Sequence, residues 1–462
     1  MLAAGLAIAL ASAFFLHGHF FNDDALITIR YSENLAAGHG LVYNPGERVL
    51  GTTTPFWALL LSLLAYVGLT LPTTATVLGI LGFGWTAAVS VLLQRQRGAT
   101  LVTQLAAAAL VGTSPLLVRW AGSGMETSFY VASIASFLWL FQAERFRALG
   151  VVGGVMLLLR PDAGVFLFAG CVLGCWSARS MKPVLRVLPG FLIVTLPWFI
   201  GATLYYGSPL PNSGFAKRLQ VADWGPFLTN FGRHVMPALA LVPFALIGGA
   251  QRLRSPRAAL PVAGLVLFVF GMHFGSLPGC AWYMPPAMFL VVLLAAEGAG
   301  SAAMALARDT SWTRSLASWA VLVGAALGHQ HLPKSAQQAK RDQAGIERLH
   351  GAIGHKLKEI APAGSSVAVD NIGYIGYRSG LRVVDIMGLV SPGIVEHLAA
   401  GDETYAIRTR RPEFLAIWVG RGATPRYTPD QAWLDENGYR PVFAIPVSPG
   451  ATAAYTIFSR LD

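Results

Sequence analysis

Two adjacent carboxylates, Asp23 and Asp24, follow the first apolar segment of the chain. Only 12% of the residues are charged, so an acidic pair beside a membrane-spanning segment needs a physical reason. The pair could stabilise the N-terminus of a helix predicted over residues 23–37, with Asn22 as its N-cap and Gly38 just after its end. One acid would satisfy that need, and two like charges side by side repel each other. We therefore favour a functional carboxylate here, such as a general base.

A third acid, Glu126, lies in the short loop AGSGMETSFY between two apolar runs. It could be solvated or could cap the following helix, and a place beside the aspartate pair explains it equally well. Together, Asp23, Asp24 and Glu126 could hold a divalent metal ion, although nothing in the sequence demands one. The three cysteines show no zinc-ligand spacing, and no other cofactor is predicted.

Basic residues near the same predicted face could bind an anion. Arg160 and Asp162 could pair with each other at a membrane boundary, or Arg160 could contact substrate. Lys217 lies in the loop 205–231, on the side that the positive-inside rule should leave poor in basic residues. That exception indicates an anionic partner, and we favour Lys217 as a ligand for a lipid-linked phosphate.

Three further residues are predicted to bind substrate, namely Asn212, His273 and Tyr283. His273 could instead be a packed histidine near a helix end. Tyr283, next to Trp282, suits either an aromatic belt at the membrane surface or a sugar-stacking surface.

The elements that must position these residues are mostly apolar helices. Hydrophobic residues make up 54% of the 462 residues, and the mean hydropathy is +0.54. This composition predicts a polytopic α-helical membrane protein embedded in a lipid bilayer. The net charge of +11 comes from short basic clusters between apolar runs, which is typical of cytoplasmic loops and argues against nucleic acid as a partner.

The basic clusters also set the topology. If the apolar run 56–70 lies at the membrane interface, anchored by Trp57 and Tyr66, all of the basic clusters fall on one side and about eleven segments span the membrane. These clusters are Arg95/Arg97, Arg145/Arg147, Arg179/Lys182/Arg186, Arg252/Arg254/Arg257 and Arg308/Arg314. Residues 1–16 could be a signal peptide, but a retained first helix fits better, and its shortness suggests that the true start lies upstream.

The predicted transmembrane catalytic domain covers residues 1–328, with a first outer loop at 17–72 and a second large outer loop at 205–231. Residues 329–462 are polar and predict a soluble α/β domain on the outer side. Within it we expect an amphipathic helix over 338–360 and strands at SSVAVD, LRVVDI, EFLAIWV, PVFAIPV and AAYTIFS. Asp370, before a glycine-rich turn, is weak evidence for binding, because a tight turn also explains the glycines.

Five segments resemble the GT-C superfamily of glycosyltransferases, enzymes that use polyprenyl-phosphate sugars. At motif level the chain is more similar to the bacterial arabinofuranosyltransferase branch that includes the mycobacterial terminal β-arabinofuranosyltransferases. The segments are FNDDALITIRYSENLAAGHGLVYNPGERVLGTTTPFW, AGSGMETSFY, LLLRPDAG, YYGSPLPNSGFAK and DNIGYIGYRSGLRVVDIMGLVSP. The chain has GMET where that branch often has GLET, and it lacks a basic residue that the branch tends to carry near Tyr283.

The resemblance implies Asp23 or Asp24 as the catalytic carboxylate, Glu126 as a second acid and Lys217 as a ligand of the donor phosphate. In the mechanism that we derive from these roles, Arg160 could be a second phosphate contact. It also implies a polyprenyl-phosphate donor of arabinofuranose and an extracytoplasmic glycan, lipid or protein acceptor. The location would be the bacterial inner membrane, with the site and the C-terminal domain on the periplasmic side. Two alternatives stay open: a transporter or flippase of a lipid-linked or anionic solute, and a non-catalytic envelope component.

Overall fold

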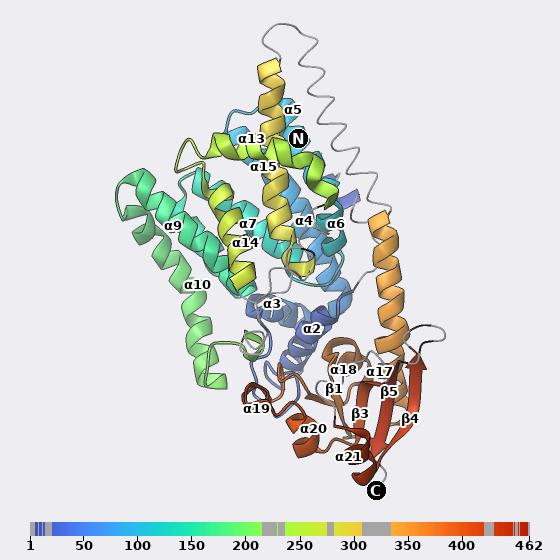
Figure 1. Ribbon diagram of the computed structural model, residues 1–462. Helices are drawn as coiled ribbons and strands as arrows, with labels where there is room; N and C mark the ends of the chain where they lie inside the picture. The colour runs from blue at the N-terminus through green and yellow to red at the C-terminus, as the bar shows by residue number, and fades with distance from the viewer. Residues whose placement is uncertain are drawn as a thin grey trace.

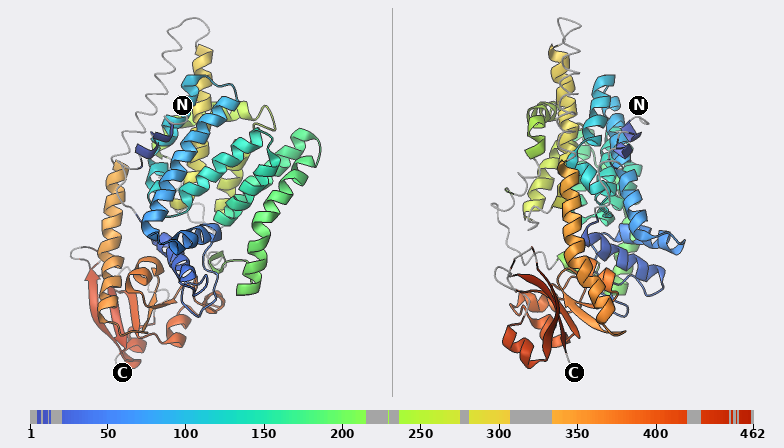
Figure 2. Two further views of the ribbon diagram at one scale, coloured as in Figure 1. Left: turned by 180° about the vertical axis from the view of Figure 1, so that it is seen from behind. Right: turned by 90° about the vertical axis from the view of Figure 1, so that its right-hand side faces the viewer.

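The computed structural model describes most of the chain as a helical bundle beside a small α/β sheet (Figure 1). The described residues are 5–7, 9–11, 13, 21–214, 229, 236–274, 281–306, 334–419, 429–446, 448, 451 and 453–460. The strands lie together at the C-terminal end of the chain, at one end of the bundle, which we call the sheet end (Figures 1 and 2).

The bundle consists of apolar helices joined by short connections. They are α4 (Leu71–Gln96), α5 (Leu101–Gly112), α6 (Pro115–Ala121), α7 (Thr127–Gln142), α8 (Phe146–Leu159), α9 (Gly164–Ala178), α10 (Lys182–Tyr206), α13 (Val242–Arg252), α14 (Leu260–Phe274) and α15 (Pro285–Leu306). The 3₁₀ turns η1 (Pro161–Ala163), η2 (Met236–Leu241) and η3 (Ala281–Tyr283) connect some of them. Because α10 ends at Tyr206, the second outer loop begins two residues later than predicted.

Among the described residues, four helical segments are long and apolar enough to cross a membrane: Leu71–Gln96, Pro161–Ala178, Lys182–Tyr206 and Pro285–Ala302. Several shorter apolar helices accompany them. The architecture is that of a helical membrane protein, as predicted. The number of about eleven spans stays a prediction, since residues 307–333 and much of 1–20 lie outside the described part of the chain.

Two helices lie across the bundle axis at the sheet end, α2 (Asp23–Ala36) and α3 (Pro55–Tyr66) (Figures 1 and 2). Both belong to the segment predicted as the first outer loop. The predicted helix over 23–37 is confirmed, with Gly38 at a φ of 83° just beyond its end. The Asn22 side chain does not cap it as predicted, because its Nδ2 donates to Met125 Sδ at 2.9 Å.

Helix α3 begins at Pro55, whose missing N–H costs nothing in the first turn of a helix. Tyr66 is 79% exposed, in keeping with an interfacial anchor. Trp57 is not an anchor: it is fully buried, stacks obliquely on Phe129, and donates from Nε1 to the carbonyl oxygen of Gly124 at 3.4 Å. The prediction failed for Trp57 because α3 packs one face on the bundle, and Trp57 lies on that face.

The C-terminal part of the chain forms a five-stranded mixed sheet of order β2-β1-β3-β5-β4. The strands are β1 (Ser366–Val369), β2 (Arg382–Asp385), β3 (Phe414–Val419), β4 (Tyr439–Pro446) and β5 (Ala454–Arg460), and all were predicted. Strand β1 runs parallel to β2 and β3, whereas β5 is antiparallel to β3 and β4. The domain boundary at 328/329 stays a prediction, because it falls among residues outside the described ranges.

Helices surround this sheet and connect it to the bundle. The predicted amphipathic helix is confirmed: residues 334–360 are helical, with a π-helical turn at Glu347–Gly351 and α17 at Ala352–Ile360. The shorter helices are α18 (Ile372–Ser379), α19 (Ile394–Ala399), α20 (Tyr405–Arg410) and α21 (Gln431–Glu436).

Arg30 fastens α2 to the C-terminal sheet region. Its buried guanidinium donates to the carbonyl oxygens of Tyr43 at 2.9 Å, Gly376 at 2.7 Å and Leu381 at 2.7 Å. The guanidinium also lies 4.4 Å from the centre of the Tyr43 ring. A buried charge is tolerated only when it is hydrogen-bonded in this way. The first outer loop and the C-terminal sheet therefore form one packed unit.

A buried ion network holds together the far end of the bundle, opposite the sheet. Glu297 of α15 accepts from Arg252 of α13 through both oxygens, with Nε to Oε2 at 2.7 Å. Gln94 of α4 donates to Glu297 Oε1 at 3.1 Å, and Arg97 Nε lies 3.9 Å from the same oxygen. We call these four residues the far-end network. It links three helices through one carboxylate.

Candidate active site

The carboxylate of Asp23 is held by the N-terminus of α18. Its Oδ1 accepts from the backbone N–H of Tyr374 at 2.6 Å, and its Oδ2 accepts from the N–H of Gly373 at 3.0 Å. These are the second and third residues of α18, whose N–H groups have no partner within the helix. The side chain of Asn371, the N-cap of α18, makes no such bond, so Asp23 caps a helix 350 residues away.

Gly373 allows this close approach. A Cβ at this position would lie 2.1 Å from the carbonyl oxygen of Asp23 and 2.6 Å from its Oδ2. The glycine-rich turn after Asp370 is therefore needed for contact with Asp23, a role that sequence alone did not reveal. Asp370 itself accepts from its neighbour Asn371 and, at 2.6 Å, from the Tyr455 hydroxyl. These contacts give Asp370 a structural role, and a binding role for it stays a prediction.

Burial raises the pKa of Asp23 to about 7. The hydrogen bond from Tyr374 opposes this shift, the neighbouring charge of Asp24 adds to it, and the charge of Asp370 adds a smaller contribution. A carboxyl group whose two oxygens both accept hydrogen bonds from backbone N–H groups is poorly placed to accept a proton from a substrate. The geometry therefore separates the two aspartates, and Asp24 becomes the better candidate for the chemistry.

The loop carrying Glu126 lies beside the aspartate pair, as predicted. The N–H of Asn22 donates to the carbonyl oxygen of Ser123 at 3.1 Å, and the side chain of Asn22 reaches Met125. Glu126 is buried, and burial raises its pKa to about 7. The nearby positive charge of Arg160 opposes that shift and the charge of Asp24 adds to it. Asp24 is thus close enough to influence the charge of both Asp23 and Glu126.

Arg160 connects Glu126 to Asp162. Its Nε and Nη2 donate to the two oxygens of Asp162, each at 3.1 Å, and its Nη1 lies 3.6 Å from Glu126 Oε1. Nη1 also donates to the carbonyl oxygen of Trp282 at 3.2 Å. The sequence left two alternatives open for Arg160, and the structure shows one of them, the pairing with Asp162. We call Glu126, Arg160 and Asp162 the sheet-end network.

Aromatic side chains frame this network. The Arg160 guanidinium lies 4.1 Å from the centre of the Tyr283 ring and 5.4 Å from that of Tyr130. The Trp282 ring packs edge-on against Trp120, with ring centres 6.2 Å apart. Tyr283 therefore lies next to the candidate site, although it comes from a segment far from Asp24 in sequence. Its role in substrate binding stays a prediction.

The other predicted substrate and phosphate contacts are only partly described. The backbone N–H of Asn212 donates to the carbonyl oxygen of Leu50 at 2.8 Å, which attaches the start of the second outer loop to the first. Lys217 lies outside the described residues. His273 belongs to α14, but its side chain is outside the described part of the chain. The roles of Asn212, Lys217 and His273 stay predictions.

The predicted three-carboxylate metal site is not formed. Within the described ranges, no group of three His, Cys, Asp or Glu side chains is arranged to hold a metal ion. Asp23 explains the difference, because both of its oxygens already accept hydrogen bonds from α18. Asp23, Asp24 and Glu126 therefore do not fit a shared metal ion.

Comparisons with known proteins agree with this architecture. Two curated relatives are both named terminal β-(1→2)-arabinofuranosyltransferase: one from Mycobacterium tuberculosis, 30% identical over 273 residues, and one from Corynebacterium glutamicum, 28% identical over 241 residues. The matches cover 52% and 45% of this chain, and 42% and 34% of those proteins. The chain thus spans less than half the length of these relatives.

Solved structures share the whole fold. ArnT from Cupriavidus metallidurans, bound to undecaprenyl phosphate, matches with a TM-score of 0.63 at 13% identity, covering 99% of this chain and 98% of that one. The apo form of the same protein gives 0.64, covering 99% and 97%. The chain has the GT-C fold. Its sequence is similar to those of terminal arabinofuranosyltransferases, as its motifs predicted, and its fold is similar to that of ArnT.

Two further matches concern the whole chain and its C-terminal part. The mycobacterial arabinofuranosyltransferase AftD matches with a TM-score of 0.50 at 12% identity, covering 100% of this chain and 40% of that one. Residues 336–458 match the model of a domain of unknown function, DUF8728. That match covers all of the described strands except the last two residues of β5.

Proposed function

We propose that this protein is a membrane glycosyltransferase that moves a sugar, arabinofuranose by similarity, from a polyprenyl-phosphate donor to an extracytoplasmic acceptor. The observation that carries the proposal is the cluster at the sheet end, where Asp24 lies beside the buried Glu126 and Arg160. Its support comes from relatives named arabinofuranosyltransferase and from the shared fold of ArnT bound to undecaprenyl phosphate.

In the proposed reaction, an acceptor hydroxyl oxygen attacks the anomeric carbon of the sugar. The bond between that carbon and the phosphate oxygen breaks, and polyprenyl phosphate leaves with the electron pair. Asp24 takes the proton of the acceptor hydroxyl as general base. The phosphate leaves without needing a proton, so the reaction needs no general acid. One carboxylate is enough, because only the proton of the acceptor hydroxyl has to be taken up. Asp23 acts by holding α2 against α18, which fixes the position of Asp24 one residue away.

Lys217 binds the donor phosphate in this proposal, because cations stabilise the charge that develops on the leaving group. Arg160 is a weaker candidate for direct phosphate contact, since its nitrogens already bond to Asp162 and Trp282. Its main role is then to hold Glu126 in place. Glu126 positions the sugar through a hydroxyl group, with Tyr283 as a stacking surface beside it.

The donor's prenyl tail lies in the bilayer, and the acceptor, a glycan, lipid or protein, approaches from the outer side. Asn212 and His273 are proposed as further substrate contacts. We infer a bacterial inner-membrane location with the C-terminal sheet on the periplasmic side, because the basic clusters of the opposite loops favour the cytoplasm.

The test is transfer of radiolabelled arabinofuranose from a polyprenyl-phosphate donor, in membranes that contain the protein and an endogenous or added acceptor. Asp24→Asn should lower the transfer rate by about 10²–10⁴-fold, the usual contribution of a general base. The matched control is Glu33→Gln, because Glu33 is also an acid of α2. Among the described residues, the hydrogen bond seen for the Glu33 carboxylate comes from the Tyr377 hydroxyl, at 3.0 Å.

The control variant should keep the transfer rate of the unmodified protein. Full activity of Asp24→Asn at normal expression would refute the assigned base. Transfer from another polyprenyl-phosphate sugar, but not from the arabinofuranose donor, would keep the reaction class and change the sugar. Failure with every donor, in the presence of acceptor, would favour a transporter instead.

A further inference from the structure

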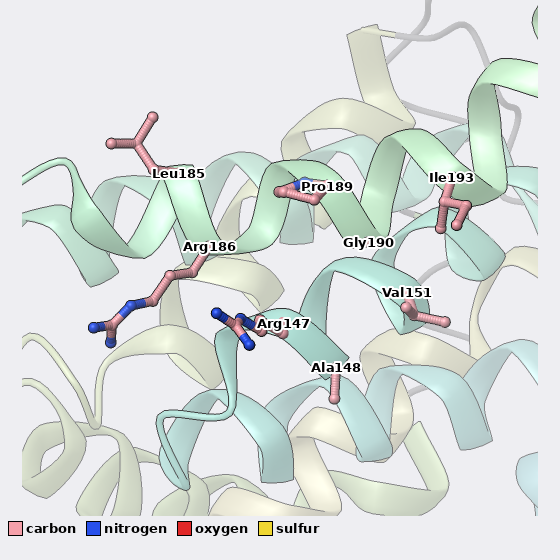
Figure 3. Close-up of a pocket in the computed structure, with 8 residues that line it drawn as sticks. All are labelled: Arg147, Ala148, Val151, Leu185, Arg186, Pro189, Gly190 and Ile193. Carbon is pink, nitrogen blue, oxygen red and sulfur yellow. The ribbon is translucent and has the colours of Figure 1, made fainter.

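A groove of about 530 Å³ lies between α8 and α10, away from the candidate active site. Its lining residues are Arg147, Ala148, Val151, Leu185, Arg186, Pro189, Gly190 and Ile193 (Figure 3). Arg147 lies in the first turn of α8 and Arg186 in the second turn of α10, at the far end of the bundle. The groove plays no part in the reaction proposed above.

Two glycines let the helix backbones touch beneath the groove. A Cβ at Gly150 would lie 2.0 Å from the carbonyl oxygen of Val187, and one at Gly190 would lie 2.7 Å from that of Arg147. Close approach through small residues is a common way for membrane helices to pack. The floor of the groove is therefore formed by the backbones of α8 and α10, which are in close contact. The larger side chains on either side form its walls.

The walls are apolar and open to the surroundings of the bundle. Leu185 is 64% exposed and Ile193 is 72% exposed, on a helix that is long and apolar enough to cross a membrane. Val151 and Ile193 lie toward one end of the groove, from the two facing helices (Figure 3). In a bilayer, such a surface contacts acyl chains.

The other end of the groove carries two guanidinium groups, those of Arg147 and Arg186 (Figure 3). Both residues are exposed, and within the described ranges neither side chain has a hydrogen bond or an ion pair. Nearby arginines differ: Arg257 pairs with Glu144 and bonds to Ser177, and Arg145 stacks on Trp139. Two cations without protein partners, at the head of an apolar groove, match a ligand with an anionic head and a hydrocarbon chain.

We propose that this groove binds an anionic glycerophospholipid from the leaflet that faces away from the C-terminal sheet. Its phosphate lies between Arg147 and Arg186, and one acyl chain follows Val151 and Ile193 along the groove. Two cations at the membrane surface attract anionic headgroups, so they select an anionic lipid over a zwitterionic one. The basic clusters favour the cytoplasmic leaflet.

The experiment uses purified, delipidated full-length protein, titrated with phosphatidylglycerol or with phosphatidylcholine and followed by native mass spectrometry. Phosphatidylglycerol should bind more tightly than phosphatidylcholine. Replacing both groove arginines (Arg147→Gln with Arg186→Gln) should weaken phosphatidylglycerol binding by about thirtyfold, the equivalent of about 1 kcal/mol per arginine, and leave phosphatidylcholine binding unchanged.

The matched control replaces two exposed arginines on the same side of the bundle but outside the groove, Arg95→Gln with Arg254→Gln. It changes the net charge equally and should leave phosphatidylglycerol binding intact. A third variant, Ile193→Trp, fills the apolar end with both charges kept and should also weaken phosphatidylglycerol binding. Since Ile193 is exposed, this variant does not disturb the core.

Equal losses in the groove and control pairs would overturn the proposal in favour of general surface charge. So would unchanged binding in the groove pair. Full displacement of phosphatidylglycerol by millimolar inorganic phosphate, with no effect of Ile193→Trp, would mean that the arginines bind free phosphate and that the groove holds no lipid. None of these outcomes bears on the transfer reaction, because neither variant pair touches the sheet end.

Discussion

The two buried ion networks of the bundle differ in their balance of charge. The far-end network places one acid, Glu297, among two arginines and a glutamine, and both of its oxygens accept hydrogen bonds. The sheet-end network places one arginine, Arg160, between two acids, and Glu126 approaches it only to 3.6 Å. Asp24 adds further negative charge beside the sheet-end network.

This difference indicates different roles. A buried acid with full pairing holds helices together, and its loss leaves unpaired charge in the interior. A buried acid with incomplete pairing has a raised pKa and can take part in binding or proton transfer near neutral pH. The far-end network is thus a structural fastening, whereas the sheet-end network has the properties of a functional site.

The largest effect expected is on stability, at the far end. Glu297→Ala leaves Arg252 buried without its carboxylate and should lower the free energy of unfolding by about 3–5 kcal/mol. Chemical denaturation in detergent micelles measures it. The transfer activity per folded molecule should stay unchanged. A loss of activity without loss of stability would mean that the far-end network has been assigned the wrong role.

The converse effect is expected at the sheet end. Glu126→Gln should lower the transfer rate by about a hundredfold, because it removes a positioned carboxylate next to Asp24. The free energy of unfolding should change by less than about 1 kcal/mol, since Arg160 keeps Asp162 as its partner. Parallel transfer assays and denaturation curves provide the comparison. A variant that is destabilised as much as Glu297→Ala would erase the distinction between the two networks.

A smaller effect is expected for the pH dependence of the contact between Asp23 and the N-terminus of α18. Because the pKa of Asp23 is raised from 3.8 to about 7, the folded protein holds this proton more tightly than the unfolded chain. The contribution of Asp23 to stability is therefore largest below pH 4 and falls as the pH rises toward 7. Hydrogen exchange at the amides of Gly373 and Tyr374 should quicken over that range.

The control for this effect is Asp23→Asn, which keeps a side-chain oxygen for capping and has no titrating group. Its exchange rates, corrected for the intrinsic effect of pH, should be flat over the same range. Asp23→Ala should also give flat exchange rates, and below pH 4 its local stability should be lower than that of the unmodified protein by about 1 kcal/mol, as for a lost helix cap. An unmodified protein with flat exchange rates would show that Asp23 does not titrate there.

The smallest effect is expected for an ion pair on the surface. Arg257 and Glu144 pair at the far end of the bundle, with side chains 57% and 49% exposed. Glu144→Gln should change the free energy of unfolding by less than about 0.5 kcal/mol and leave the transfer rate unaltered. Denaturation with added salt checks this, since salt should change the two proteins alike. A large loss of stability would mean that an exposed ion pair can matter as much as a buried one. Burial would then not explain the importance of the two networks.

The sequence by itself determined the local elements. The alternation and composition of residues 366–460 predicted all five strands. The acidic first turn and Gly38 predicted a helix over 23–37, and the structure has it at Asp23–Ala36. The sequence also singled out Asp23, Asp24, Glu126 and the region of Arg160 as charged residues beside apolar segments and therefore as candidates for a functional site. These features depend on neighbours along the chain, and hydrophobic periodicity and turn chemistry report such local preferences directly.

Only the tertiary structure decided which charges meet. Asp23 bonds to residues 350 and 351 positions away, Arg30 to residues 346 and 351 positions away, and Arg252 to one 45 positions away. No local pattern encodes such contacts, because they follow from how helices pack. For the same reason Asp23 and Asp24, which are neighbours in sequence, become different in the folded protein. The N-terminus of α18 binds the carboxylate of Asp23, and the charge of Asp24 acts on the buried Glu126.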